Sequence, residues 1–67
     1  MTLNMTVYNV TDKWVEILKH DCASRGGWAE VKGNDVEITG KGPMERMFEL
    51  MSVGTRYGDY KVTLSSV

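Results

Sequence analysis

The chain begins with apolar and polar side chains in alternation. Leu3, Met5 and Val7 alternate with polar residues as far as Tyr8. A period of two is typical of a strand that buries one face and exposes the other. The pattern therefore predicts a first strand over residues 2–8, with Tyr8 on its exposed face.

Apolar residues recur at spacings of three and four in the next segment, which predicts an amphipathic helix over residues 12–23. Thr11 or Asp12 is suited to cap its first turn. Gly26 and Gly27 can end it, because glycine tolerates the left-handed conformation that closes helices. The buried stripe of this helix is expected to contain Trp14, Val15, Ile17, Leu18 and Cys22.

Two short alternating runs lie between Trp28 and Thr39. They flank Gly33, Asn34 and Asp35, which are residue types suited to positive φ angles in a tight turn. The segment therefore predicts a β-hairpin. Its alternation places Trp28 on the exposed face of the sheet.

A second helix is predicted from Pro43 to about Ser52, because the fixed φ of proline suits the first helical position and Gly54 can stop the helix. We expect its apolar stripe to fill the core. The alternative is that part of the helix, with Leu50 or Val53 beside the stripe, leaves adaptable apolar surface for a partner. The stripe consists of Met44, Met47, Phe48 and Met51.

The last segment alternates again, which predicts a strand with Tyr60, Val62 and Leu64 on one face. With right-handed crossovers, the order strand, helix, hairpin, helix, strand predicts an α+β domain. Its β-α-β-β-α-β split sheet would be ferredoxin-like, with four antiparallel strands and both helices on one face. The alternative is an irregular α+β hairpin-and-helix domain, stabilised as a dimer by its first strand. Because many activities share the ferredoxin-like fold, this prediction leaves function open.

The length of 67 residues limits the chain to a single domain, residues 1–67, with one small core. A core of this size contributes little net stability, so small domains often add a disulfide, a metal or a partner subunit. We therefore expect association. A homodimer is one candidate, since exposed edge strands favour pairing.

The charge balance disfavours nucleic acid as a partner. The chain has 8 basic and 9 acidic residues, a net charge of −1, which lacks the basic excess that duplex DNA requires. RNA-binding sheets place aromatic side chains on both central strands, whereas Glu37 and Thr39 are expected to point outward here. The sequence also lacks an apolar run of the roughly 20 residues that a membrane span needs, and a signal peptide. With Cys22 as the only cysteine, these features favour the cytoplasm.

The sequence offers few groups for catalysis or metal binding. Cys22 and His20 are the only cysteine and histidine, too few for a zinc site. His20, Asp21 and Cys22 are adjacent on a helix, so their side chains diverge and cannot act on one substrate atom. The carboxylates show no metal-ligand spacing. We expect no enzyme, no cofactor and no metal, with Cys22 buried and His20 on the surface.

The stretch "GKGPMER" is the most site-like part of the sequence. Backbone N–H groups of Gly40 and Gly42, with Lys41 and Arg46, could hold a small anion such as a nucleotide. However, the phosphate-loop and dinucleotide patterns are absent, and Pro43 removes one N–H donor. A structural connector is the favoured interpretation, and an anion site is the alternative.

Aromatic residues indicate a protein-binding surface. Trp28 and Tyr8 are expected on the open sheet face, and Tyr57 follows Arg56 in the turn before the last strand. Trp, Tyr and Arg are enriched in protein–protein hot spots. The alternative is that Trp28 covers the edge of the core. We therefore expect a non-catalytic protein-binding module. Inhibitors and regulators that occlude or adapt a larger protein, including those of mobile genetic elements, often have this profile.

Overall fold

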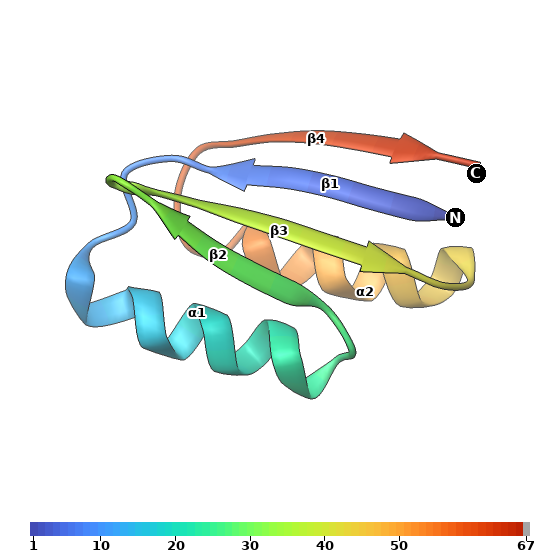
Figure 1. The fold of residues 1–67 in the computed structure, drawn as a ribbon, viewed down its shortest axis with the longest axis horizontal. Helices are drawn as coiled ribbons and strands as arrows, with labels where there is room; N and C mark the ends of the chain where they lie inside the picture. The colour runs from blue at the N-terminus through green and yellow to red at the C-terminus, as the bar shows by residue number, and fades with distance from the viewer. Residues whose placement is uncertain (67) are drawn as a thin grey trace.

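The predicted order of elements is confirmed in the computed structural model, which describes residues 1–66 (Figure 1). At most ends, the observed limit of a strand or helix is within two residues of the expected one. The elements are β1 (Thr2–Val7), α1 (Asp12–Ser24), β2 (Trp28–Lys32), β3 (Asp35–Lys41), α2 (Met44–Gly54) and β4 (Tyr60–Ser65).

The four strands form one antiparallel sheet in the order β2-β3-β1-β4. Both helices lie on the same face of this sheet, and the other face is open (Figure 1). This is the expected ferredoxin-like split sheet. β1 is a central strand that pairs with β3 and β4 of its own chain, so the dimer-stabilised alternative is not needed.

The core lies between the sheet and the helices and is entirely apolar. The alternation predicted for β1 supplies Leu3, Met5 and Val7, and Val36 and Ile38 lie beside them on β3. No polar or charged side chain is buried among residues 1–66. The core comprises Leu3, Met5, Val7, Val10, Leu18, Cys22, Val36, Ile38, Met47, Leu50 and Val53.

The hairpin between β2 and β3 turns through Gly33 and Asn34. Gly33 has a φ of 63°, so glycine occupies the first central position of a two-residue loop, as in a type II′ turn. β3 continues to Lys41 beyond the expected end near Thr39. Gly40 and Lys41 are therefore strand residues.

Helix α2 buries a different stripe from the one predicted. Met47 is buried as expected, but the exposed fractions of Met44 and Phe48 are 51% and 46%. Leu50 and Val53 take their place in the core. The prediction was wrong for Met44 and Phe48 because the apolar residues of α2 occupy more than one face.

Glycines on the sheet side decide which face of α2 is buried. A Cβ atom at Gly40 would lie 2.6 Å from Cδ2 of Leu50, and one at Gly27 would lie 2.6 Å from its Cδ1. The missing side chains thus leave the space that Leu50 fills. Gly40 in "GKGPMER" has a packing role for this reason.

The ends of the helices differ slightly from expectation. Thr11 precedes α1 at the N-cap position, without a capping bond from its side chain. Pro43 is the N-cap residue of α2 and not its first helical residue, and Gly54 is the last residue of α2. On α1, Trp14 and Ile17 are exposed and not part of the buried stripe. In the part of the chain described, neither helix has the length and apolar character needed to cross a membrane.

Candidate functional site

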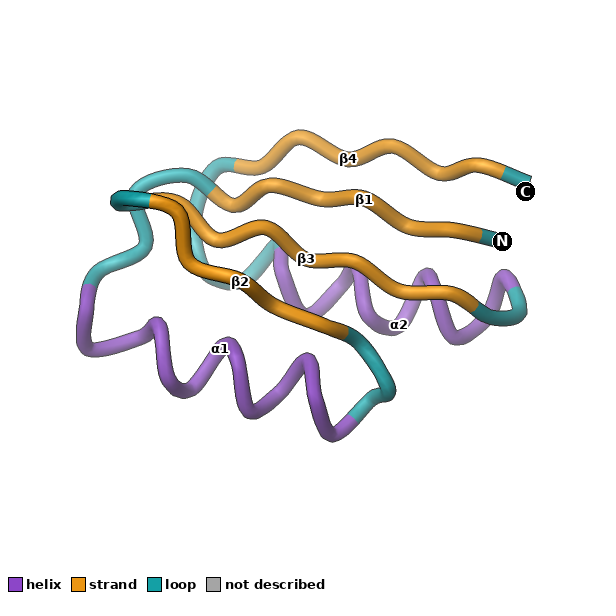
Figure 2. The backbone as a smooth tube through the Cα atoms, viewed as in Figure 1, coloured by secondary structure: helices purple, strands orange, loops and turns teal. Residues whose placement is uncertain are grey.

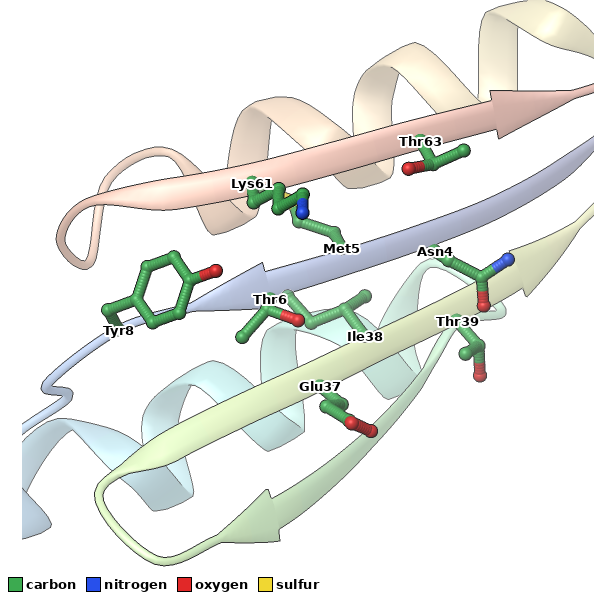
Figure 3. Close-up of a pocket in the computed structure, with 9 residues that line it drawn as sticks. All are labelled: Asn4, Met5, Thr6, Tyr8, Glu37, Ile38, Thr39, Lys61 and Thr63. Carbon is green, nitrogen blue, oxygen red and sulfur yellow. The ribbon is translucent and has the colours of Figure 1, made fainter.

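The outward side chains of the four strands form a surface that we call the open face. Because side chains alternate along a strand, the residues between the core positions point away from the helices. Figure 3 shows several of them on one side of the sheet. The open face consists of Thr2, Asn4, Thr6, Trp28, Glu30, Lys32, Asp35, Glu37, Thr39, Lys41, Lys61, Thr63 and Ser65.

Trp28 is the most exposed large apolar side chain of the described chain, with 71% of its surface accessible. It pairs with Thr39 on β3, which pairs with Asn4 on β1. The prediction that Trp28 points outward is therefore confirmed. The alternative that it covers the core is excluded by its exposure.

Lys41 and Trp28 border the same shallow hollow, which has a volume of about 380 Å³. The sequence placed them in two separate hypotheses, protein binding and anion binding. The antiparallel pairing of β2 with β3 brings them to one corner of the sheet. The hollow is lined by Thr2, Asn4, Gly26, Gly27, Trp28, Thr39, Gly40 and Lys41.

Tyr8 lies at the opposite end of the open face, just after β1. It borders a polar hollow of about 340 Å³ that also includes Thr6 and Lys61 (Figure 3). Tyr8 is partly buried, and its N–H donates to the carbonyl of Asp59 at 2.8 Å. Tyr8 and Trp28 thus share a face but belong to different hollows.

Charged residues on the β2–β3 hairpin pair with each other. Glu30 and Glu37 lie directly opposite across the strands, and Nζ of Lys32 lies 3.2 Å from Oε1 of Glu37. The pKa of Lys32 is raised, first by its hydrogen bond to Glu37 and also by the nearby charge of Glu30. Lys32 and Glu37 thus form a cross-strand charge pair on the hairpin.

Tyr57 and Arg56 lie on the helical side of the molecule. The hydroxyl of Tyr57 donates to Oδ2 of Asp21 at 2.7 Å, and its ring meets Trp14 edge-on with centroids 6.3 Å apart. The hydrogen bond to Asp21 is the main reason that the pKa of Tyr57 is raised. Tyr57, Arg56 and Trp14 border a hollow of their own. The four predicted partner-binding residues therefore divide between two sides of the molecule.

The backbone of the "GKGPMER" stretch is already engaged. The N–H of Gly42 donates to the carbonyl of Met1 at 3.0 Å, and the carbonyl of Gly42 accepts a hydrogen bond from the backbone nitrogen of Met1 at 2.8 Å. An anion at this turn would have to compete for the Gly42 donor. Arg46 borders a different hollow, together with Arg25 and Glu49. Of the predicted set, Gly40 and Lys41 border the hollow beside Trp28, and of these two Lys41 carries the charge.

The His20–Cys22 segment is arranged as expected. Cys22 is buried in the core, and burial raises the pKa of its thiol to about 11, while His20 is exposed on α1. The thiol and the imidazole therefore point in different directions. Across residues 1–66, no three or more His, Cys, Asp or Glu side chains are gathered so that they could hold a metal ion.

A second apolar surface lies on the helical side; the sequence indicated it only through the alternative in which part of the second helix leaves apolar surface for a partner, and did not connect it with β4. This surface includes Met44 and Phe48 of α2 and Tyr60 of β4, of which about half is exposed in each case. The signal was present in the excess of apolar residues on α2 over what one helical face can bury.

Comparison with protein-family models, with curated proteins and with solved structures finds no match.

Proposed function

We propose that this chain is a non-catalytic protein-binding module that regulates a larger protein by covering part of its surface. The observation that carries the proposal is Trp28, with 71% of its side chain exposed at a corner of the open face. Leaving such a large apolar surface in water is unfavourable, by about 25 cal/mol for each Å². A partner that covers the indole would recover this free energy.

The surroundings of Trp28 fit a binding anchor. Its neighbours Thr39 and Asn4 are small and polar, so they can form the hydrogen-bonding rim around a central aromatic residue. Charges on the open face occur with both signs, which suits a protein partner better than a polyanion. Inhibition is one way in which such a module regulates its partner.

Trp28→Ala tests this proposal, with Trp14→Ala as the matched control. Trp14 is the second tryptophan and is also exposed, but it lies on the helical side against Tyr57. We expect affinity capture followed by mass spectrometry to lose specific partners with Trp28→Ala and to retain them with Trp14→Ala. The melting temperature of Trp28→Ala should stay close to that of the wild type.

One result would contradict the protein-binding proposal: the Trp28→Ala chain captures the same proteins as the wild type in equal amounts. This includes the case in which neither chain captures a specific partner. A large loss of thermal stability in Trp28→Ala would mean that the indole serves the fold and not a partner.

A second candidate function is the binding of a small anionic ligand, such as a nucleotide. The specific observation in its favour is that Lys41 and Trp28 border one hollow. An indole can stack on a base, and a lysine can contact a phosphate. This arrangement depends on Lys41 and Trp28, and does not need the engaged N–H of Gly42.

A panel of nucleotides and inorganic phosphate tests the second candidate. A ligand that binds the folded state raises the melting temperature. We expect Lys41→Ala to abolish that rise, and Arg46→Ala to leave it unchanged because Arg46 borders another hollow. The absence of any rise at millimolar ligand would rule out this candidate without affecting the protein-binding proposal.

A further inference from the structure

The β4 edge of the sheet is only partly covered by the helices. β4 is the terminal strand next to β1 (Figure 2). Helix α2 lies below the central strands, since a Cβ at its Gly54 would meet Met5 of β1 and Ile38 of β3. Val62 and Leu64 of β4 are consequently only partly buried.

Apolar side chains of α2 and β4 remain exposed on the helical side of the sheet. On α2, Met44, Phe48 and Met51 share one face because they are spaced by four and three residues. Met51 is partly buried and packs against the same core as Val62. Met44 is 51% exposed, Phe48 46% and Tyr60 49%. We call this surface the β4 strip; it comprises Met44, Phe48, Met51, Tyr60, Val62 and Leu64.

Backbone hydrogen bonds show which residues of β4 direct their N–H and C=O groups outward. The N–H of Tyr8 donates to the carbonyl of Asp59, a pair that continues the β1–β4 register. Hydrogen-bonded and non-hydrogen-bonded pairs alternate along an antiparallel ladder. Lys61 and Thr63 therefore direct their groups toward β1. The outward groups belong to the alternate residues Tyr60, Val62 and Leu64.

These outward groups and the apolar side chains belong to the same residues, which makes the edge self-complementary. In an antiparallel pair of two β4 strands centred on Val62, Tyr60 of each copy lies opposite Leu64 of the other, and Val62 lies opposite Val62. Each of these pairs is of the hydrogen-bonded type. In this arrangement the helices of both copies lie on the same side of the joined sheet. The β4 strip of one copy therefore meets the β4 strip of the other.

Charge and apolar pairing favour this register over its neighbours. With the centre at Val62, Lys61 lies opposite Thr63 of the second copy. A shift of the centre to Lys61 would place two lysines directly opposite, which is destabilising. A shift to Thr63 would leave Tyr60 without an apolar residue of β4 opposite it. The register centred on Val62 is the one that pairs every outward residue.

We propose that the β4 edge is covered by a second copy of this chain, which pairs antiparallel through β4 about a two-fold axis at Val62. The dimer joins the two sheets into one continuous sheet and buries the β4 strips against each other. The open faces, with Trp28, lie on the opposite side of the joined sheet. The dimer therefore leaves the proposed partner-binding surface accessible.

The β2 edge is less suited to this role. β2 carries Glu30 and Lys32 on either side of Val31, and charged side chains on an edge oppose pairing. Helix α1 also contacts β2 extensively, so less of its inner face is left to bury. β2 nevertheless supplies the matched control, because Val31 is an apolar edge residue with its side chain 42% exposed.

Val62→Pro tests the proposal, with Val31→Pro as control. Proline removes the N–H of residue 62, which points away from β1, and proline is tolerated on edge strands. By the same alternation, the N–H of Val31 points away from β3. By analytical ultracentrifugation we expect the wild type and Val31→Pro to reach twice the chain mass of 7.5 kDa as concentration rises. Val62→Pro should weaken dimerisation by at least about tenfold, with circular dichroism confirming that it is folded.

A cysteine variant provides a second measurement that does not depend on tolerance of proline. Opposed residues of a hydrogen-bonded pair have Cα atoms about 5.5 Å apart, within the range that a disulfide can span. Val62→Cys should therefore form a covalent dimer in a glutathione redox buffer, and Val31→Cys should not. The native Cys22 does not interfere, because it is buried in the core.

The outcomes are decisive in both directions. A wild-type chain that remains monomeric at about 1 mM overturns the proposal. So does a dimer that Val31→Pro abolishes and Val62→Pro preserves, which would assign the interface to β2. Because Val62 and Val31 are not part of the open face, partner capture and dimerisation can fail independently.

Discussion

At the scale of a single residue, Cys22 makes the stability of the fold depend on pH. Burial, together with the nearby charge of Asp21, raises the pKa of its thiol from 9.0 to about 11. Between these values the folded chain keeps a proton that the unfolded chain loses. The stabilisation is therefore complete below pH 9.0 and is lost as the pH rises toward about 11.

We predict that the free energy of unfolding falls by about 1.4 kcal/mol for each pH unit in this range. Urea unfolding at a series of alkaline pH values measures this slope. Cys22→Ala should flatten it while lowering stability at neutral pH. The pKa of Tyr57 is also raised, so its ionisation also lowers the free energy of unfolding as the pH rises. Some dependence of stability on pH should therefore remain in Cys22→Ala. An unchanged slope in Cys22→Ala would show that the thiol is not responsible.

At the scale of elements, the position of α2 depends on Leu50 and the glycines beneath it. A side chain at Gly40 would lie 2.6 Å from Leu50, so one of the two must move. We predict that Gly40→Ala costs about 1–3 kcal/mol, the usual cost of overpacking a core. Denaturant unfolding provides the measurement.

A double-mutant cycle with Leu50→Val is the control for this prediction. If the cost of Gly40→Ala arises from the contact with Leu50, it should shrink once Leu50 is shortened, by a coupling of about 0.5–3 kcal/mol. Additive costs would mean that Gly40 serves the backbone of β3 and not the packing of α2. In that case "GKGPMER" would need another explanation.

At the scale of the whole molecule, a small core is combined with apolar surface that the fold leaves uncovered. Within residues 1–66, eleven residues form the buried core, and large apolar residues stay exposed in several places: Trp28 on the open face, Met44, Phe48 and Tyr60 in the β4 strip, Trp14 and Ile17 on α1, and Val31 on β2. A domain of this size gains only about 3–5 kcal/mol from its core. The proposed dimerisation through β4 would add burial where the helices do not reach, and it would leave Trp28 accessible.

Much of the fold could be predicted from local patterns. Some features affect only the residues next to them in the chain. They are the alternation in β1 and β4, the glycine turn at Gly33 and the proline before α2. For this reason the element order, the ferredoxin-like sheet and the outward direction of Trp28 could be predicted. The buried face of α2 could not, because it depends on Gly27 and Gly40, which are distant from Leu50 in sequence.

The candidate site divides in the same way. The sequence by itself determined which residues could act as anchors, since exposure of Trp28 follows from alternation along its own strand. Only the tertiary structure decided which of them lie together. Strand pairing brought Lys41 beside Trp28 and left β4 at a partly covered edge, and packing against α1 placed Tyr57 on the helical side. These are consequences of register and packing between segments far apart in the chain, and a local pattern of apolar and polar residues contains no information about them.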